Sequence, residues 1–155
     1  MSGGERPILL VEDNPDDVDL TLRAFKRAGV SRRVDVVTDG VEALDYLFCR
    51  AGHAARAGQP PPAVVLLDLK LPRLDGHEVL RHIRADPRTR LLPVVILSSS
   101  VEEEDVVRGY GGGANSYVRK PVSYTEFVEA ARQLGLYWLA LDHGAPVEPF
   151  PGARG

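Results

Sequence analysis

Five short apolar runs divide the chain, and longer stretches of mixed polarity separate them. The runs are Ile8–Val11, Val34–Val37, Ala63–Leu67, Val94–Leu97 and the weaker Ser116–Val118. The first, third and fourth runs are continuously apolar and do not alternate with polar residues. Because such a strand needs cover on both of its faces, this pattern predicts the buried strands of a parallel sheet with helices on either side.

Apolar residues in the intervening stretches recur every three or four positions, which is typical of a helix with one buried face. The stripes are Val18/Leu22/Phe25, Val41/Leu44/Phe48, Val79/Leu80/Ile83, Val106/Val107/Tyr110 and Phe127/Ala131/Leu134/Trp138. Asn14 before Pro15 predicts a helix start, and so do the capping-box patterns that begin at Asp75, Ser100 and Ser123. Gly29 and Gly111 lie where helices would stop.

A strand followed by a helix therefore occurs five times. Because crossovers between parallel strands are right-handed, this order predicts an α/β fold with a doubly wound five-stranded parallel sheet and five helices. We expect residues 7–141 to form one domain, with a disordered N-terminus at 1–6 and a Pro/Gly-rich tail at 142–155. The Gly/Ala/Pro-rich stretch Arg50–Pro62 is predicted to be a long connection before the third strand.

Composition excludes several classes of protein. The 155 residues carry 19 basic and 22 acidic side chains, a net charge of −3, so we expect no nucleic-acid partner. No apolar stretch approaches the roughly 20 residues that span a membrane, and residues 1–6 have no apolar signal core. The single Cys49 excludes an internal disulfide and a multi-cysteine metal site. We therefore expect a cytoplasmic protein without a membrane partner.

Candidate chemistry lies at the strand ends, where ligands bind in open α/β sheets. Glu12 and Asp13 follow the first strand, Asp68 ends the third, Ser98 ends the fourth and Lys120 follows the fifth. Each residue alone has an ordinary interpretation, as a helix-start acid, a cap or a surface lysine. Together they place three carboxylates, a hydroxyl and an amine at one edge of the sheet.

This combination of side chains favours phosphoryl transfer. Mg²⁺ prefers oxygen ligands and would relieve the repulsion among three carboxylates. An aspartate beside the metal can act as a covalent nucleophile toward phosphorus. Lys120 and Ser98 would neutralise charge on the transferring oxygens.

The sequence resembles the receiver domain of two-component response regulators over roughly residues 7–140. The matching segments are Ile8–Asp13, Asp68 with Leu71–Gly76, Pro93–Ser98 and Gly113–Pro121. The resemblance implies a flavodoxin-like fold with strand order 2-1-3-4-5. It also implies that the protein is not an enzyme with external turnover but a Mg²⁺-dependent phosphoacceptor that assists its own phosphorylation and dephosphorylation.

Specific roles follow from the resemblance. Asp68 would be the phosphoacceptor. Asp13, Asp68 and the backbone carbonyl of Lys70 would hold Mg²⁺, and Glu12 would act through a bound water.

The remaining roles concern the phosphoryl oxygens and the response to phosphorylation. Lys120 would contact the oxygens, and a cis peptide to Pro121 would aim it. Ser98 and Tyr117 match the switch hydroxyl and the switch aromatic.

The resemblance implies a stand-alone receiver without an output domain, phosphorylated by a sensor histidine kinase. Three details are similar to regulators of phytochrome-type kinases: the acids of Glu12–Asp17, the long loop before the third strand, and Tyr137-Trp138. The stretch Leu136–Leu141 is apolar on nearly all sides, so it either extends the domain core or forms a homodimer interface together with the fifth helix.

Three alternatives differ in what they require of the sequence. An Asp-nucleophile phosphatase would use an acid two residues after Asp68, where this chain has Lys70. An FMN binder would need a neutral, hydroxyl-rich loop in place of Glu12–Asp17. A phosphorylation-independent scaffold would not need the full set of acids, hydroxyl and lysine.

The four histidines show no metal-ligand grouping and are predicted to be surface residues: His53, His77, His82 and His143.

Overall fold

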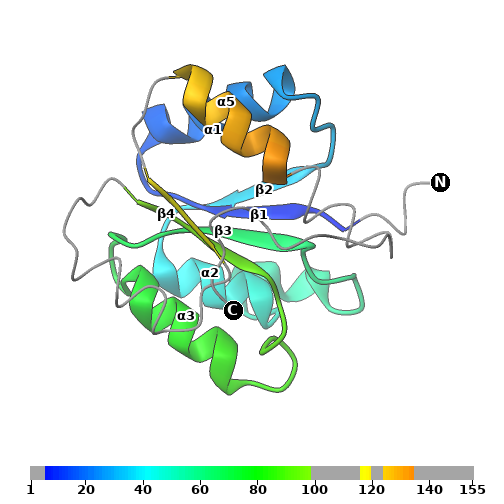
Figure 1. Ribbon diagram of the computed structural model, residues 1–155. Helices are drawn as coiled ribbons and strands as arrows, with labels where there is room; N and C mark the ends of the chain where they lie inside the picture. The colour runs from blue at the N-terminus through cyan, green and yellow to red at the C-terminus, as the bar shows by residue number, and fades with distance from the viewer. Residues whose placement is uncertain (1–5, 99–115, 120–123, 135–155) are drawn as a thin grey trace.

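In the computed structural model, which describes residues 6–98, 116–119 and 124–134, a parallel sheet lies between two layers of helices (Figure 1). Its strands are β1 (Ile8–Val11), β2 (Val34–Val37), β3 (Val64–Asp68), β4 (Val94–Ser98) and β5 (Ser116–Arg119). The spatial order is β2-β1-β3-β4-β5, and every neighbouring pair is parallel. The predicted sheet and strand order are confirmed.

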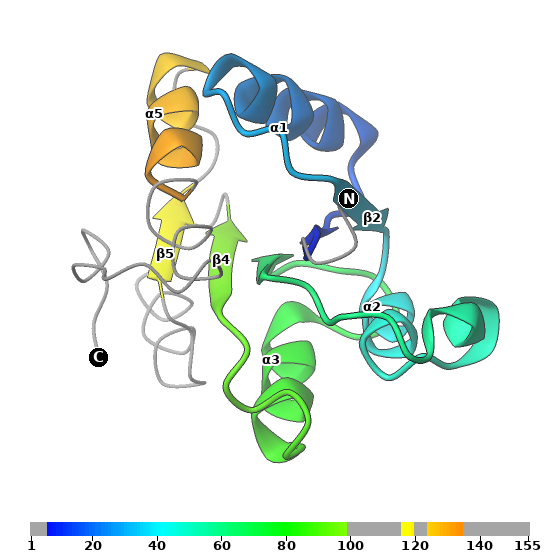
Figure 2. The ribbon, with the colours of Figure 1, turned by 90° about the vertical axis from the view of Figure 1, so that its right-hand side faces the viewer.

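Helices cover both faces of the sheet, as a doubly wound fold requires. They are α1 (Pro15–Arg27), α2 (Gly40–Leu47), α3 (Gly76–Ala85) and α5 (Tyr124–Leu134), with a 3-10 helix, η2 (Ala51–Arg56). α1 and α5 lie side by side on one face, and α2 and α3 lie on the other (Figures 1 and 2). The helix predicted around Val106–Tyr110, residues 1–5 and the tail at 142–155 lie outside the described residues.

The continuous apolar runs contribute to a hydrophobic core on each face of the sheet. Successive side chains of a strand point to opposite faces, so the residues of one run pack alternately into the two cores. Leu9, Val11 and Leu67 pack in the core under α2 and α3. Ile8 and Leu10 pack in the core under α1 and α5. All four residues of β1 are buried, as the unbroken run predicts.

The predicted helix starts at Asn14 and Asp75 are formed by side-chain caps, whereas those at Ser100 and Ser123 lie outside the described residues. The Asn14 side chain accepts hydrogen bonds from the Asp16 and Asp17 amides at 2.8 and 3.3 Å, and Pro15 opens α1. The Asp75 side chain accepts from the Glu78 amide at 3.0 Å. Gly29, which has a φ of +83°, follows the end of α1.

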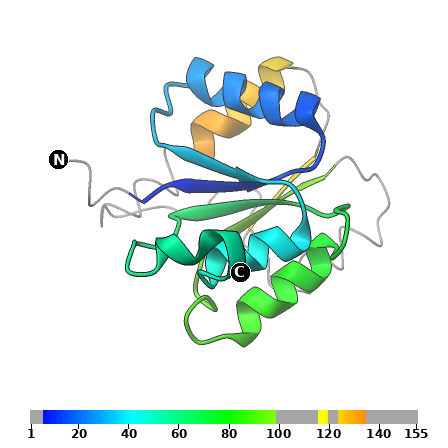
Figure 3. The same ribbon diagram turned by 180° about the vertical axis from the view of Figure 1, so that it is seen from behind.

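The connection at Arg50–Pro62 contains more structure than its composition predicts. Seen from behind, η2 continues from α2 along the same face of the sheet (Figure 3). The Arg56 guanidinium lies 3.6 Å from the centroid of the Tyr46 ring and donates to the Tyr46 carbonyl at 2.6 Å. Burial, with the hydrogen bond to Asp35 as the next cause, raises the pKa of Tyr46 and keeps its hydroxyl a donor. These contacts anchor the connection to α2.

Gly76 is expected to be intolerant of alanine although it begins a helix. A Cβ at this position would lie 2.3 Å from the Asp68 carbonyl oxygen and 2.7 Å from the Leu69 Cα. Gly76→Ala should therefore lower the free energy of unfolding by about 1–3 kcal/mol, against the helix preference for Ala of about 1 kcal/mol. Urea denaturation measures the change. Gly52→Ala is the control, because its Cβ would meet no atom within 4 Å. Equal stability of the two variants would contradict the packing argument.

Candidate functional site

Strand register brings the acidic residues to the same edge of the sheet. Val11 of β1 pairs with Leu67 of β3, so the next residues, Glu12 and Asp68, occupy matching positions. Asp13 follows Glu12 at the start of the loop into α1. Because parallel strands end together, the acids of β1 and β3 meet beyond the sheet, as their order in the sequence predicts.

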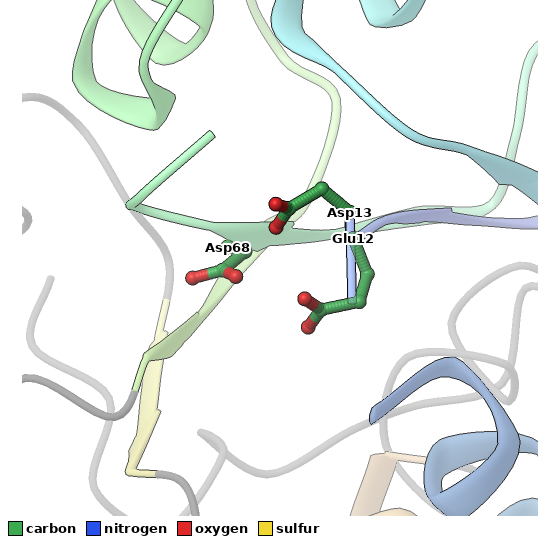
Figure 4. Close-up of side chains that lie close together, drawn as sticks. All are labelled: Glu12, Asp13 and Asp68. Carbon is green, nitrogen blue, oxygen red and sulfur yellow. The ribbon is translucent and has the colours of Figure 1, made fainter. Parts of the chain in front are cut away.

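The three side chains gather beyond the ends of β1 and β3 (Figure 4). Each of Glu12, Asp13 and Asp68 contributes one carboxylate oxygen to a group within 4.8 Å of one another. Glu12 is 1% exposed and Asp68 is 9% exposed, whereas Asp13 is open to solvent. The cluster is therefore buried on one side and accessible on the other.

Backbone contacts fix these carboxylates. The Asn14 amide donates to Glu12 Oε2 at 3.2 Å, and the Lys70 amide donates to Asp68 Oδ1 at 3.3 Å. The Glu12 amide continues the β2 pairing by donating to the Val37 carbonyl at 3.0 Å. Asp68 therefore sits at the junction between a rigid strand and the loop that contains Lys70.

The donor set fits a hard divalent cation. Three carboxylates at this separation repel, and oxygen ligands with an open side suit Mg²⁺, which commonly keeps several waters. A hollow of about 410 Å³ adjoins the cluster, and its lining includes Asp13, Lys70 and His77. The cluster thus offers oxygen ligands for a cation, and its exposed member, Asp13, lines a hollow beside it.

The other predicted site residues are placed only in part. Ser98 ends β4 and pairs with Arg119 of β5, and Tyr117 pairs with Ile96, so both backbones lie in neighbouring strands. The side chains of Ser98 and Tyr117 lie outside the described structure. Lys120 and its peptide to Pro121 lie outside the described residues altogether.

Two features of the site were missed from the sequence. His77, predicted to be a surface residue, is half-buried and lines the hollow. Arg73 pairs with Asp39, with its Nη2 3.0 Å from Oδ2. Burial would raise the pKa of Asp39, but hydrogen bonds from the Glu42 amide and Arg73 lower it below its ordinary value. Asp39 is thus a carboxylate at neutral pH.

Within the described residues, none of the helices combines the length and apolar character needed to cross a membrane.

Comparison with known families matches residues 8–132 to the response regulator receiver domain, and this chain belongs to that family. The fold and the acidic cluster agree with this assignment. Receiver domains bind divalent metal, which the oxygen-rich cluster of this chain suits.

Within the family, the chain resembles regulators related to phytochromes. It is 48% identical to the bacteriophytochrome response regulator RtBRR (TM-score 0.75; 96% of this chain and 86% of that one). It is 35% identical to the phosphorylated cyanobacterial phytochrome response regulator RcpA (TM-score 0.78; 88% and 96%). The Mn²⁺-bound form of response regulator Rcp1 gives 29% identity (TM-score 0.77; 92% and 99%).

The chain is also similar to a relative whose name does not refer to phytochromes. The probable methanogenesis regulatory protein FilR2 of Methanothrix harundinacea is 43% identical over 132 residues, which cover 85% of this chain and 83% of that protein.

Proposed function

We propose that this chain is a response regulator receiver that accepts a phosphoryl group on Asp68 from a sensor histidine kinase. The observation that carries the proposal is the cluster of Glu12, Asp13 and Asp68 at the ends of β1 and β3 in a member of the receiver family. Asp68 is the acid that directly ends the buried strand β3, so the strand holds it in place beside Glu12 and Asp13.

The proposed transfer is a displacement at phosphorus. A carboxylate oxygen of Asp68 forms a new P–O bond while the P–N bond to the kinase histidine breaks, and the imidazole leaves with the electron pair and takes up a proton. Mg²⁺ bound at the cluster would neutralise charge on the phosphoryl oxygens. Glu12, Asp13, Asp68 and the Lys70 carbonyl are the proposed holders of the ion.

The remaining family residues complete the proposal. Lys120 would contact the phosphoryl oxygens as a cation. Ser98 and Tyr117 would respond to the new acyl phosphate and change the binding surface around β5 and α5. Their positions in β4 and β5, which are neighbours in the sheet, support this assignment.

We further propose a phytochrome-type kinase as the partner and the cytoplasm as the location. Similarity to RtBRR and RcpA supports the partner. The location would follow from phosphorylation by a kinase domain in the cytoplasm. A net charge of −3 with no basic excess supports an output through protein contacts and not through nucleic acid.

Incubation with acetyl phosphate and Mg²⁺, followed by intact mass, separates the candidate functions. A stable gain of one phosphoryl group is the expected result. No gain would favour a phosphorylation-independent scaffold, and sustained phosphate release would favour an Asp-nucleophile phosphatase. An Asp-nucleophile phosphatase would need an acid at the second position after Asp68. This chain has Lys70 there, which supports the receiver.

We propose a homodimer that uses α5 and the apolar stretch Leu136–Leu141, which lies outside the described residues. Tyr and Trp are common interface anchors, so Tyr137→Asp/Trp138→Asp should convert a dimer into a monomer. Sedimentation at tens of micromolar measures this. The control Leu91→Asp changes an exposed apolar residue between α3 and β4, outside α5, and should stay dimeric. A monomeric wild type, with and without phosphorylation, would contradict the dimer.

A further inference from the structure

We propose that Arg73 is a positioning residue for the phosphoryl and metal site, because its ion pair with Asp39 clamps a strained turn in the loop that contains Lys70. This inference rests on the proposed function, since it concerns the same metal site. It assigns a task to two residues that lie outside the carboxylate cluster.

The strain is located at Arg73 itself. Its φ is +67°, a left-handed conformation that a long side chain rarely adopts. The Leu74 amide donates to the Pro72 carbonyl at 2.7 Å, which makes Arg73 the central residue of a three-residue turn. Turns of this kind with positive φ are rare and persist only where the surroundings enforce them. A residue without a Cβ would suit the backbone better, so the arginine needs another explanation.

The Arg73 side chain contacts a fixed partner. Its Nη2 lies 3.1 Å from Oδ1 and 3.0 Å from Oδ2 of Asp39. The Asp39 carboxylate also accepts from the Glu42 amide at 2.7 Å as the N-cap of α2, and its side chain is only 17% exposed. Arg73 therefore binds a carboxylate that the start of α2 already holds in place.

Backbone contacts beside the ion pair join the same two segments. The Gly40 amide donates to the Pro72 carbonyl at 3.3 Å. A Cβ at Gly40 would lie 1.9 Å from the Leu74 carbonyl oxygen, so the loop packs directly on the backbone at the start of α2. The turn is thus fixed against the junction of β2 and α2.

This clamp lies three residues from the proposed metal ligand. The Lys70 amide donates to Asp68 Oδ1, and the Gly76 amide donates to the Leu69 carbonyl at 2.8 Å, so both ends of the loop are held near Asp68. Lys70 and Pro72 line the hollow beside Asp13. Because the turn is held, the Lys70 carbonyl has less freedom to lose when a cation binds. The entropic cost of binding is therefore lower.

The direction in which Mg²⁺ affinity changes distinguishes a positioning role of Arg73 from a purely electrostatic one. Removing a cation near three carboxylates would strengthen Mg²⁺ binding if charge alone acted. If Arg73 positions the loop, Arg73→Met should instead weaken Mg²⁺ binding by about three- to tenfold. This is less than the roughly 10- to 100-fold typical of residues that support metal ligands, because the ion pair is partly exposed. Titration calorimetry of the unphosphorylated protein measures the affinity without any phosphorylation reaction.

Four further variants make the test specific. Arg81→Met removes the same charge from an exposed arginine of α3 that pairs with Glu78, and should not weaken binding. Arg73→Lys keeps a single nitrogen for Asp39 and should recover most of the affinity. Arg73→Gly removes the ion pair with Asp39 but relieves the backbone strain at a positive φ. It should therefore weaken Mg²⁺ binding without lowering the melting temperature. In Asp39→Asn, which retains the N-cap, adding Arg73→Met should have little further effect.

Two results would overturn the inference. If Arg73→Met binds Mg²⁺ as tightly as wild type or more tightly, Arg73 does not position the loop, while the proposed function stands. If the wild type itself binds no Mg²⁺ at the cluster, the proposed function and this inference both fail. Weakening by Arg73→Met with rescue by Arg73→Lys supports the clamp.

Discussion

Asp68→Asn should take up no detectable phosphoryl group from acetyl phosphate under conditions in which the wild type gains one. Asparagine keeps the shape of the side chain but has no carboxylate oxygen to attack phosphorus. The fold should persist, because removing one of three clustered carboxylates relieves repulsion at the end of β3. Intact mass measures the uptake, and urea denaturation shows whether the variant is folded.

Asp75→Asn is the matched control for this experiment. Asp75 lines the hollow that adjoins the cluster, and its side chain caps α3 through the Glu78 amide, a role that asparagine fills equally well. This variant should take up a phosphoryl group as the wild type does. Uptake by Asp68→Asn at the wild-type rate would show that another group accepts the phosphoryl, and the assignment of Asp68 would be wrong.

Asp13→Asn should weaken Mg²⁺ binding by about ten- to a hundredfold. Asp13 is the exposed member of the cluster, so it can reach a hydrated cation from solvent. Substitution removes a charged ligand and leaves a neutral oxygen, which Mg²⁺ prefers less. Calorimetry at physiological salt measures the affinity, and the rise in melting temperature with added Mg²⁺ should shrink in parallel.

Asp16→Asn separates ligation from general charge. Asp16 is an exposed acid in the first turn of α1, three residues further along the chain and outside the cluster. Screening at physiological salt should limit its effect on Mg²⁺ affinity to about twofold. Equal losses in the two variants would mean that the cluster attracts Mg²⁺ without binding it at Asp13.

Local signals made the fold and the acidic cluster predictable. The unbroken run Ile8–Val11 indicates a strand covered on both faces, and Asn14 with Pro15 indicates where α1 begins, because strand burial and capping act over a few residues. Strands that end together then place Glu12, Asp13 and Asp68 at one edge. The strand order itself came from the resemblance to receivers.

Features that depend on contacts between distant segments were not predictable in the same way. Arg73 and Asp39 are 34 residues apart, and their pairing depends on how the loop after β3 packs on the start of α2. The 3-10 helix η2 forms where Arg56 lies on the Tyr46 ring, a contact that the Gly/Ala/Pro-rich composition around it does not indicate. Propensity and periodicity describe neighbours along the chain, so they cannot reveal such pairs.

The most direct test of the central claim is to locate the phosphoryl group. The wild type would be treated with acetyl phosphate in Mg²⁺ or in excess chelator, reduced with borohydride to trap the acyl phosphate, and mapped by peptide mass spectrometry. The account predicts modification at Asp68 in Mg²⁺ and little or none in chelator. Modification at another acid, or equal modification of Asp68 without the metal, would contradict it.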